Sequence, residues 1–412
     1  MTAEVPSFIQ ARDEADPIRM FRQRFSLPPG IVYLDGNSLG ALPTATAPRL
    51  DELVRQEWGV GLIRSWNSHD WIGASRRVGD KIATLVGARA GEVVVADSTS
   101  VNIFKLLMAA IAARPGRKII LSETDNFPTD LYVAQGIAAL LPQQTVRAVD
   151  PGKVLEAIDK DVAVILLTHV HYKTGQKYDM ARITKRAHEC GALIIWDLSH
   201  STGAVDVDLG AVDADMAVGC GYKYLNGGPG APAFVYVAKR LQGELKSPIT
   251  GWFGHAAPFE FAGNFQPATD INRFLSGTPP VLALAGLEIG VALLAEAPRK
   301  LLFQKSQELC SLFIERIDKT CQGYGLEVVT PRDPQERGSH VSLRHPEGYP
   351  IIRALIARGV IGDFRAPDIL RFGIAPLYLS FADIWRAADA LRDVLVTRQW
   401  DTAEFKARAP VT

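Results

Sequence analysis

Between residues 90 and 240 the chain alternates short apolar runs with longer amphipathic segments. The apolar runs are short and rich in β-branched residues, which is typical of buried strands. They predict seven strands, at residues 92–97, 118–123, 145–150, 162–170, 192–199, 215–221 and 233–239. Amphipathic segments at 101–113 and 181–191 predict connecting helices. Near-continuous apolar strands joined by helices indicate an α/β fold with a mostly parallel seven-stranded sheet, covered on both faces.

The pattern changes after residue 280. Residues 281 to about 323 predict a long helical stretch that joins two domains. Beyond it, shorter elements predict a smaller α+β domain, with strands at 326–331, 340–346 and 369–376 and helices at 351–359 and 381–396. We therefore expect three parts: an N-terminal segment (1–45) that joins the small domain, a large domain (46–290) and a small C-terminal domain (291–412).

Composition narrows the possible partners and compartment. The 412 residues include 45 Lys and Arg and 45 Asp and Glu, so neither nucleic acid nor an anionic membrane is an expected partner. The polar N-terminus lacks the features of a secretory signal, and no apolar run reaches membrane-spanning length. The cysteines show no CxxC spacing (Cys190, Cys220, Cys310 and Cys321), so we expect no metal site and no disulfide framework. Together these features predict a cytoplasmic protein with reduced thiols.

Polar side chains follow several predicted strands at the point where each strand ends. They lie at 98–100, 125–130, 169–171, 197–201 and 223. In a mostly parallel sheet, ligands bind outside the carboxyl ends of the strands. The sequence therefore predicts a site with acid, hydroxyl, imidazole and amine groups at one edge of the sheet.

Lys223 lies between two tyrosines, after an apolar run and before a glycine-rich turn. A lysine at the end of a strand can simply extend its amine to solvent, and Asp197 alone could cap a helix or a turn. Asp197, His200 and Lys223 together form a more specific pattern. Pyridoxal phosphate uses a lysine that forms a Schiff base and a carboxylate that pairs with its pyridine nitrogen. The pattern therefore favours a pyridoxal-phosphate site.

Two further segments bear on this hypothesis. Ser and Thr residues at 98–100 open a helix, where exposed N–H groups and hydroxyls bind phosphate as well as cap the helix. Phe127 lies in a loop-like segment, where its ring can stack on a planar cofactor. The segment Gly36–Gly40 (GNSLG) matches the nucleophile elbow of serine hydrolases, but that elbow turns directly into a helix and ALPTATAP intervenes here. We therefore interpret it as a false match.

The ordered motifs YLDGNSLG, NFPTDLY, THVHYKTGQ, WDLSHSTGAV, GYKYLNGGPG, GWFGH and RFGIAPLY closely resemble the kynureninase family, especially its bacterial members. The resemblance covers the chain from about residue 18 to the C-terminus. It implies a fold-type-I pyridoxal-phosphate enzyme that acts as a homodimer, with active sites at the interface. The implied reaction is hydrolytic cleavage of L-kynurenine to anthranilate and L-alanine.

The resemblance also implies roles for individual residues. The catalytic group would be Lys223, which bonds to the cofactor, Asp197 on the pyridine nitrogen, and Tyr222 as a proton relay. The other cofactor contacts would be Thr99, Ser100, Phe127, Asp130, Thr168 and His200, with Trp252 and Thr278 from the other subunit. The substrate contacts would be Arg371 on the carboxylate, with Ser38 and Trp66 at the aromatic end. Animal enzymes carry His and Asn where Trp66 and Thr278 stand, so we expect preference for kynurenine over its 3-hydroxy derivative.

Three alternatives remain. A cysteine desulfurase or selenocysteine lyase shares this fold, but a persulfide mechanism needs a cysteine on a mobile loop, and ERGSHVSLRHPEG contains none. An aminotransferase shares the Asp–Lys pair and would need an oxo-acid acceptor. A cofactor-binding regulator would normally carry a basic DNA-binding segment, which the sequence does not show.

Overall fold

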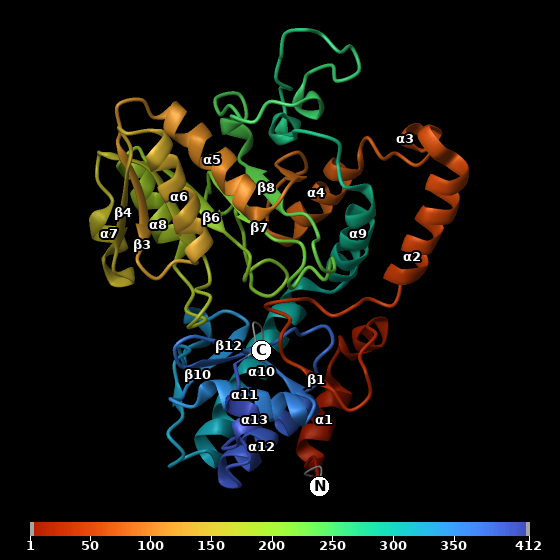
Figure 1. The fold of residues 1–412 in the computed structure, drawn as a ribbon, viewed down its shortest axis with the longest axis vertical. Coiled ribbons are helices and arrows are strands. Elements are labelled where there is room, and N and C mark those ends of the chain that lie inside the picture. The colour runs from red at the N-terminus through yellow and green to blue at the C-terminus, as the bar shows by residue number, and fades with distance from the viewer. Residues whose placement is uncertain (1–3, 409–412) are drawn as a thin grey trace.

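The computed structural model describes residues 4–408. A seven-stranded sheet forms the centre of its larger part (Figure 1). In pairing order the strands are β2 (Val93–Val95), β8 (Phe234–Val237), β7 (Met216–Gly219), β6 (Leu193–Asp197), β5 (Val162–Thr168), β3 (Ile119–Glu123) and β4 (Thr145–Val149). All pairs are parallel except those that β8 makes with β2 and β7. The seven predicted strands and the mostly parallel sheet are confirmed.

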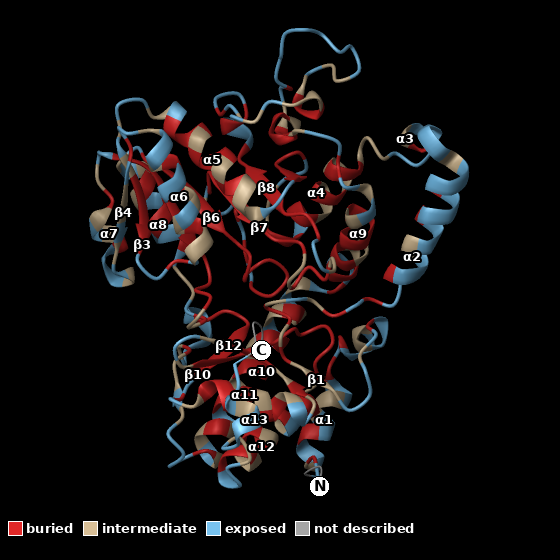
Figure 2. Ribbon diagram, in the orientation of Figure 1, coloured by how far each residue is buried: buried red, intermediate tan, exposed pale blue. Residues whose placement is uncertain are grey.

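Helices cover both faces of this sheet, and β5 shows how its two faces separate. Val164 and Leu166 belong to the apolar cluster that contains the inner sides of α5 (Thr99–Ala113) and α6 (Pro128–Leu140). Ile165 and Leu167 point the other way, into the cluster that holds the helices α4 (Ala74–Leu85), α8 (Met180–Glu189) and α9 (Val281–Glu296). Figure 2 shows the strands buried between these layers. Alternation of side chains along a strand explains why the strand is apolar throughout.

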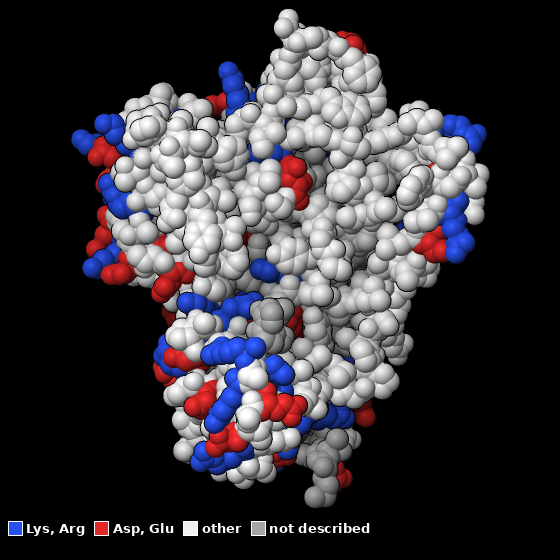
Figure 3. Space-filling model, in the orientation of Figure 1, with Lys and Arg blue, Asp and Glu red and all other residues white. Residues whose placement is uncertain are grey.

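A smaller part follows, built around a four-stranded antiparallel sheet in the order β12-β13-β10-β9. Its strands are β12 (Asp363–Arg365), β13 (Ile369–Gly373), β10 (His340–Arg344) and β9 (Glu327–Val328). Three helices pack with it: α10 (Arg299–Thr320), α11 (Gly348–Ala357) and α12 (Phe381–Val396). Two short helices are α13 (Ala403–Lys406), which contacts α11, and α7 (Val154–Ala157), which contacts β3 of the large sheet. Lys and Arg side chains lie along the boundary with the larger part on the face drawn in Figure 3.

The N-terminal segment lies beside the C-terminal elements. Helix α1 (Ser7–Ala15) contacts α12, and β1 (Val32–Tyr33) pairs in parallel with β11 (Val360–Ile361). Next along the chain, α2 (Thr46–Glu52), a π-helical segment (Leu53–Gly61) and α3 (Ser65–Ser68) form an arm that projects from the body (Figure 1). The domain bounds 1–45, 46–290 and 291–412 stay a prediction, and their outer ends lie outside the described residues.

The helical stretch expected from 281 to about 323 is two helices rather than one. Helices α9 and α10 are bent by 91° at a break between Glu296 and Arg299. Pro298 explains the break, because proline lacks an N–H donor and restricts the preceding Ala297 to an extended backbone. Over residues 4–408, no single helix has the length and apolarity needed to cross a membrane, and only this bent pair meets both criteria when its halves are combined.

Helix α9 packs closely against the turn that follows Lys223. A Cβ atom built on Gly290 would lie 2.1 Å from the carbonyl oxygen of Leu225, whereas Gly136 in α6 has open space around it. We predict that Gly290→Ala lowers the free energy of unfolding by about 1–3 kcal/mol through overpacking. The matched control Gly136→Ala should raise the free energy of unfolding by about 0.5–1 kcal/mol, since Gly136 is exposed and alanine stabilises the interior of a helix more than glycine does. Urea unfolding of both variants tests this, and equal effects would contradict it.

Candidate active site

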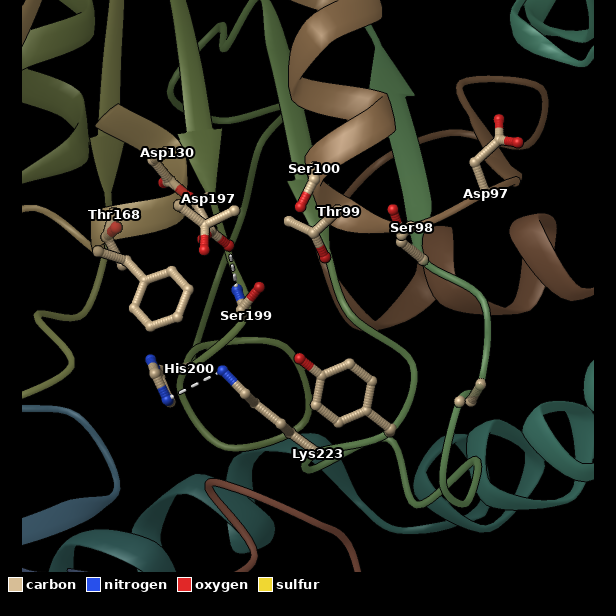
Figure 4. Close-up of a pocket in the computed structure, with 16 residues that line it drawn as sticks. Asp97, Ser98, Thr99, Ser100, Asp130, Thr168, Asp197, Ser199, His200 and Lys223 are labelled. Carbon is tan, nitrogen blue, oxygen red and sulfur yellow. Dashed lines mark hydrogen bonds between the residues drawn. The ribbon is translucent and has the colours of Figure 1, made fainter. Parts of the chain in front are cut away.

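A cavity of about 500 Å³ opens at the carboxyl edge of the large sheet. Most of the predicted cofactor contacts line it. These are Thr99, Ser100, Phe127, Asp130, Thr168, Asp197, His200, Tyr222 and Lys223. Figure 4 shows Asp197 and Lys223 reaching into the cavity from opposite sides. The sheet edge therefore collects these groups as the strand pattern predicted.

The strand ends explain how distant residues meet. Thr168 is the last residue of β5 and pairs in register with Asp197, the last residue of β6. Lys223 follows β7, the next strand in the sheet. On the other side, Ser98 caps α5 by accepting the Val101 N–H at 3.4 Å. One edge therefore presents an acid, an amine and the N-terminus of a fifteen-residue helix.

The amine of Lys223 lies beside a buried imidazole. Its Nζ is 3.2 Å from Nε2 of His200, and that nitrogen is also 3.2 Å from the carbonyl oxygen of Asn37. Burial and the positive charge of Lys223 hold the pKa of His200 well below its ordinary value, so its ring is neutral. A neutral ring can exchange a hydrogen bond with the amine without adding a second positive charge.

Two buried carboxyl groups face the same cavity. Asp197 accepts the N–H of Ser199 at 2.7 Å, and Oδ2 of Asp130 has no hydrogen-bond partner among the described residues. Burial raises the pKa of both carboxyl groups, although Ser199 and Lys223 partly oppose this at Asp197. Buried carboxyls with few partners need a cationic group to become ionised. A protonated pyridine nitrogen in the cavity meets that need.

The helix end of the cavity suits a phosphate group. The hydroxyls of Thr99 and Ser100 lie at the N-terminus of α5, where free N–H groups and the helix dipole favour an anion. Asp97 would repel an anion, but Lys105 forms an ion pair with Asp97, and the Asp97 side chain points away from the cavity in Figure 4. The residues present thus fit both ends of pyridoxal phosphate.

Aromatic rings flank the amine. The Lys223 Nζ lies 5.8 Å from the centroid of the Phe127 ring and 5.9 Å from that of Tyr222. Tyr172 packs edge-on against Phe127, with centroids 5.3 Å apart. Burial raises the pKa of Tyr222, so its hydroxyl keeps its proton at neutral pH. A cofactor ring in the cavity would therefore meet Phe127 and a protonated phenol.

Arg371 lies outside this cavity, buried in β13. Its Nε donates to Oδ1 of Asp363 at 2.8 Å, and its Nη1 donates to the carbonyl of Tyr172 at 2.7 Å. Its Nη2 donates to Ser38 at 3.0 Å. Ser38 is thus in contact with the predicted carboxylate-binding arginine, and its predicted place at the aromatic end of the substrate stays untested. The GNSLG segment forms a loop with no helix directly after it, as expected of a false elbow.

Besides Arg371 and Ser38, three more predicted residues do not line the cavity of this chain. Trp66 packs against Trp71 and Phe253, with ring centroids 5.8 and 5.9 Å away. Trp252 lies in an aromatic group with exposed Phe259 and Phe261, and Thr278 is exposed. For Trp252 and Thr278 this agrees with the expectation that they serve another subunit's site, which stays a prediction.

Sequence reasoning missed Asp363 and Arg365, which surround Arg371. Nη2 of Arg365 forms an ion pair with Oδ2 of Asp363 at 2.8 Å and donates a hydrogen bond to Ser38 at 3.4 Å, while Ser38 donates to the same carboxylate oxygen at 2.6 Å. The only signal was the charged pair in GDFRAP ahead of the strand that carries Arg371. A charge pair next to a strand is usually solvated, so that signal was weak.

Two family models match the chain. The Kynureninase C-terminal domain model matches residues 302–391, and the DegT/DnrJ/EryC1/StrS aminotransferase family model matches residues 73–218. Among solved structures, the apo cysteine desulfurase from Thermococcus onnurineus NA1 superposes with a TM-score of 0.76 at 17% identity, over 92% of this chain and 98% of that one. Cysteine desulfurase CsdA from Escherichia coli gives a TM-score of 0.73 at 20% identity, over 92% and 98%. The fold is that of fold-type-I pyridoxal-phosphate enzymes.

Curated relatives define the family within that class. The chain is 50% identical to the kynureninase of Pseudomonas fluorescens and 48% identical to that of Burkholderia pseudomallei (strain 1106a). Both alignments span 408 residues and 98% of each protein. The chain therefore belongs to the kynureninase family. The desulfurase structures are at most 20% identical and show the fold alone.

A persulfide mechanism would need a cysteine on a mobile loop, and a metal site would need a group of metal-ligating side chains. All four cysteines are free thiols, and burial raises the pKa of Cys220, three residues before Lys223. Within residues 4–408, no three His, Cys, Asp or Glu side chains group in a way that could hold a metal ion.

The charge cluster near Arg371 generates a pH prediction. Burial and the nearby Asp363 raise the pKa of Asp35 from 3.8 to about 7, although Ser38 and two arginines oppose them. The folded chain therefore binds this proton more tightly than the unfolded chain, and Asp35 lowers stability progressively as pH rises from about 4 to about 7. Asp35→Asn removes this titration.

We predict that Asp35→Asn becomes more stable relative to wild type between pH 5 and pH 8. Urea unfolding at both pH values measures the change, with Asp51→Asn on the exposed side of α2 as the control for loss of a carboxylate. A stability difference that does not depend on pH would contradict the raised pKa.

Proposed function

We propose that this protein binds pyridoxal 5'-phosphate and cleaves the Cβ–Cγ bond of L-kynurenine by hydrolysis, giving anthranilate and L-alanine. The observation that carries the proposal is the enclosed Lys223 amine opposite Asp197, in a chain half identical to a kynureninase over almost its full length. The reaction is that of a hydrolase acting on carbon–carbon bonds in ketonic substances.

The residues that would hold the cofactor surround the cavity. Lys223 provides the amine that bonds to it, and Asp197 provides the carboxylate for its pyridine nitrogen. Thr99 and Ser100 receive its phosphate at the start of α5, and Phe127 covers its ring. When bound, pyridoxal phosphate supplies an electron-accepting ring that stabilises negative charge at the substrate's Cα.

The chain's own groups move the protons. The Lys223 amine, once exchanged for that of the substrate, takes the proton from Cα, and His200 beside it stays neutral. Cleavage requires water to add to the γ-carbonyl before the Cβ–Cγ bond breaks. The bonding electron pair stays on Cβ, which must gain a proton to give alanine, and Tyr222, which keeps its phenolic proton at neutral pH, would relay that proton.

Substrate binding would use groups that lie outside the cofactor cavity. Arg371 lies in β13 of the small sheet, where Asp363 and the carbonyl of Tyr172 accept its hydrogen bonds. It binds the α-carboxylate of kynurenine. Ser38 and Trp66 contact the substrate, with Trp66 at its aromatic end. Trp66 and Thr278 stand where the animal enzymes carry His and Asn, and this difference favours kynurenine over 3-hydroxykynurenine.

A homodimer completes the site in this proposal. Trp252 and Thr278 lie away from their own chain's cavity and are available to a partner's. The projecting arm exposes apolar side chains, among them Trp58 and Ile63, on a surface that a second copy could cover (Figure 2). We expect the dimer to work in the cytoplasm, without nucleic acid or membrane as a partner.

We predict that purified, cofactor-loaded protein converts L-kynurenine into anthranilate and alanine in equal amounts. Anthranilate fluorescence and alanine quantification in the same sample measure this. Sulfide from L-cysteine would instead indicate a desulfurase, and alanine formed only with an oxo acid would indicate an aminotransferase.

Lys223→Ala should lower this activity to below about one thousandth of wild type, since it removes both the bond to the cofactor and the Cα base. Lys239→Ala, an exposed lysine beyond the far end of β8, is the matched control and should keep full activity. Substantial activity in Lys223→Ala would reject the assigned role.

A further inference from the structure

A single carboxylate holds two arginines next to the loop that reaches Lys223. Asp363 begins β12 and lies directly opposite Arg371 in the antiparallel pairing with β13. Its Oδ1 accepts from Nε of Arg371, and its Oδ2 accepts from Arg371 and Ser38. Arg365 forms an ion pair with the same Oδ2 at 2.8 Å. The carboxyl side chain is only 5% exposed, so water does not replace these contacts.

The arrangement needs that carboxylate for electrostatic reasons. Two guanidinium groups that lie beside the same carboxylate oxygen repel each other strongly at low dielectric. Although burial opposes ionisation, the charges of Arg371 and Arg365 and the hydrogen bonds from Arg371 and Ser38 hold the pKa of Asp363 down to about 2, so it is ionised at neutral pH. The other carboxyl group of this cluster, Asp35, is only partly ionised at neutral pH, because burial and Asp363 raise its pKa to about 7. The group therefore keeps an excess of positive charge, which suits an incoming carboxylate.

The two arginines differ in what they can offer a ligand. Asp363 and Ser38 occupy the Nε and Nη2 side of Arg371, and Tyr172 takes one Nη1 hydrogen. A guanidinium has five N–H donors, so one Nη1 hydrogen is left for a ligand. The Arg371 side chain is 2% exposed, whereas that of Arg365 is 36% exposed. Arg365 is therefore the accessible guanidinium of the pair.

One short loop ties this group to the cofactor lysine. Ser38 contacts Asp363, and its neighbour Asn37 places a carbonyl 3.2 Å from Nε2 of His200. Two residues further, the N–H of Gly40 donates to the carbonyl of Tyr222 at 2.7 Å. The distance between the arginine pair and the reacting amine is thus set by a segment fixed at both ends.

We propose that Asp363 is a positioning residue that holds Arg371 and Arg365 together, and that Arg365 is a second arginine contacting the substrate's α-carboxylate. The inference rests on the proposed function, because it names that substrate. It predicts that Asp363 affects binding of the carboxylate and leaves recognition of the rest of the substrate unchanged.

The test compares L-kynurenine with kynuramine, the analogue that lacks the carboxylate. In Asp363→Asn, the KM for L-kynurenine should rise about tenfold or more, as expected for a lost charge-assisted interaction, with kcat within about threefold of wild type. The dissociation constant of kynuramine, measured from the absorbance change of the bound cofactor, should stay within about twofold. A purely structural role would weaken both ligands equally, and that result would overturn the proposal.

Asp368→Asn is the matched control, because Asp368 also pairs with an arginine of the small sheet, Arg344, but does not contact Arg371. It should leave both ligands unaffected. Arg365→Gln should weaken L-kynurenine about tenfold and leave kynuramine unchanged. An unchanged KM for L-kynurenine in Arg365→Gln would overturn the role of Arg365.

Removing Asp363 alone leaves the buried guanidinium of Arg371 and the partly exposed one of Arg365 without this counter-charge, which can prevent folding. The double variant Asp363→Asn with Arg365→Gln removes one charge of each sign, and it takes the place of the single variant if that does not fold. It must show the same selective loss for L-kynurenine. Wild-type protein that cleaves no L-kynurenine would reject the proposed function, whereas active wild type with unselective variants would reject only this inference.

Discussion

The structure depends on enclosing one lysine amine among groups that do not neutralise it with a simple ion pair. Lys223 faces a neutral His200 and shares its cavity with the buried carboxyls of Asp197 and Asp130. Burial raises the pKa of both carboxyls and lowers that of the histidine. The charged forms of these groups are therefore destabilised until a charged, planar molecule fills the cavity. The sheet, the α5 terminus and the packing of α9 behind the lysine all maintain this enclosure.

Much of that arrangement follows from sequence pattern. Seven apolar runs gave seven strands, because strands buried on both faces must be apolar throughout. Asp197 and Thr168 meet because both end neighbouring parallel strands, a relation that the order of motifs already indicates. The helix at Phe381–Val396 coincides with its predicted range, and Ser380 begins it with a capping box.

Other features lay beyond sequence reasoning for physical reasons. The group around Arg371 combines Ser38 with Asp363, residues more than three hundred positions apart, and no local pattern reports such a contact. The parallel pairing of β1 with β11 is equally distant and involves strands of two residues each. The break at Pro298 did have a signal, but the strong apolar pattern on both sides outweighed it. Trp252 and Thr278 do not line the cavity of this chain, and their place in another subunit's site stays a prediction.

The fold and the roles of individual residues are separate conclusions, and Lys223 is central to both. The fold is shared with enzymes of quite different chemistry, whereas the GNSLG loop connects this lysine to Asp363 and the arginine pair. The most direct measurement is therefore borohydride reduction of the cofactor-loaded protein, followed by peptide mass analysis. We predict a phosphopyridoxyl group on the peptide that contains Lys223. The same group on another lysine, or on none, would contradict it.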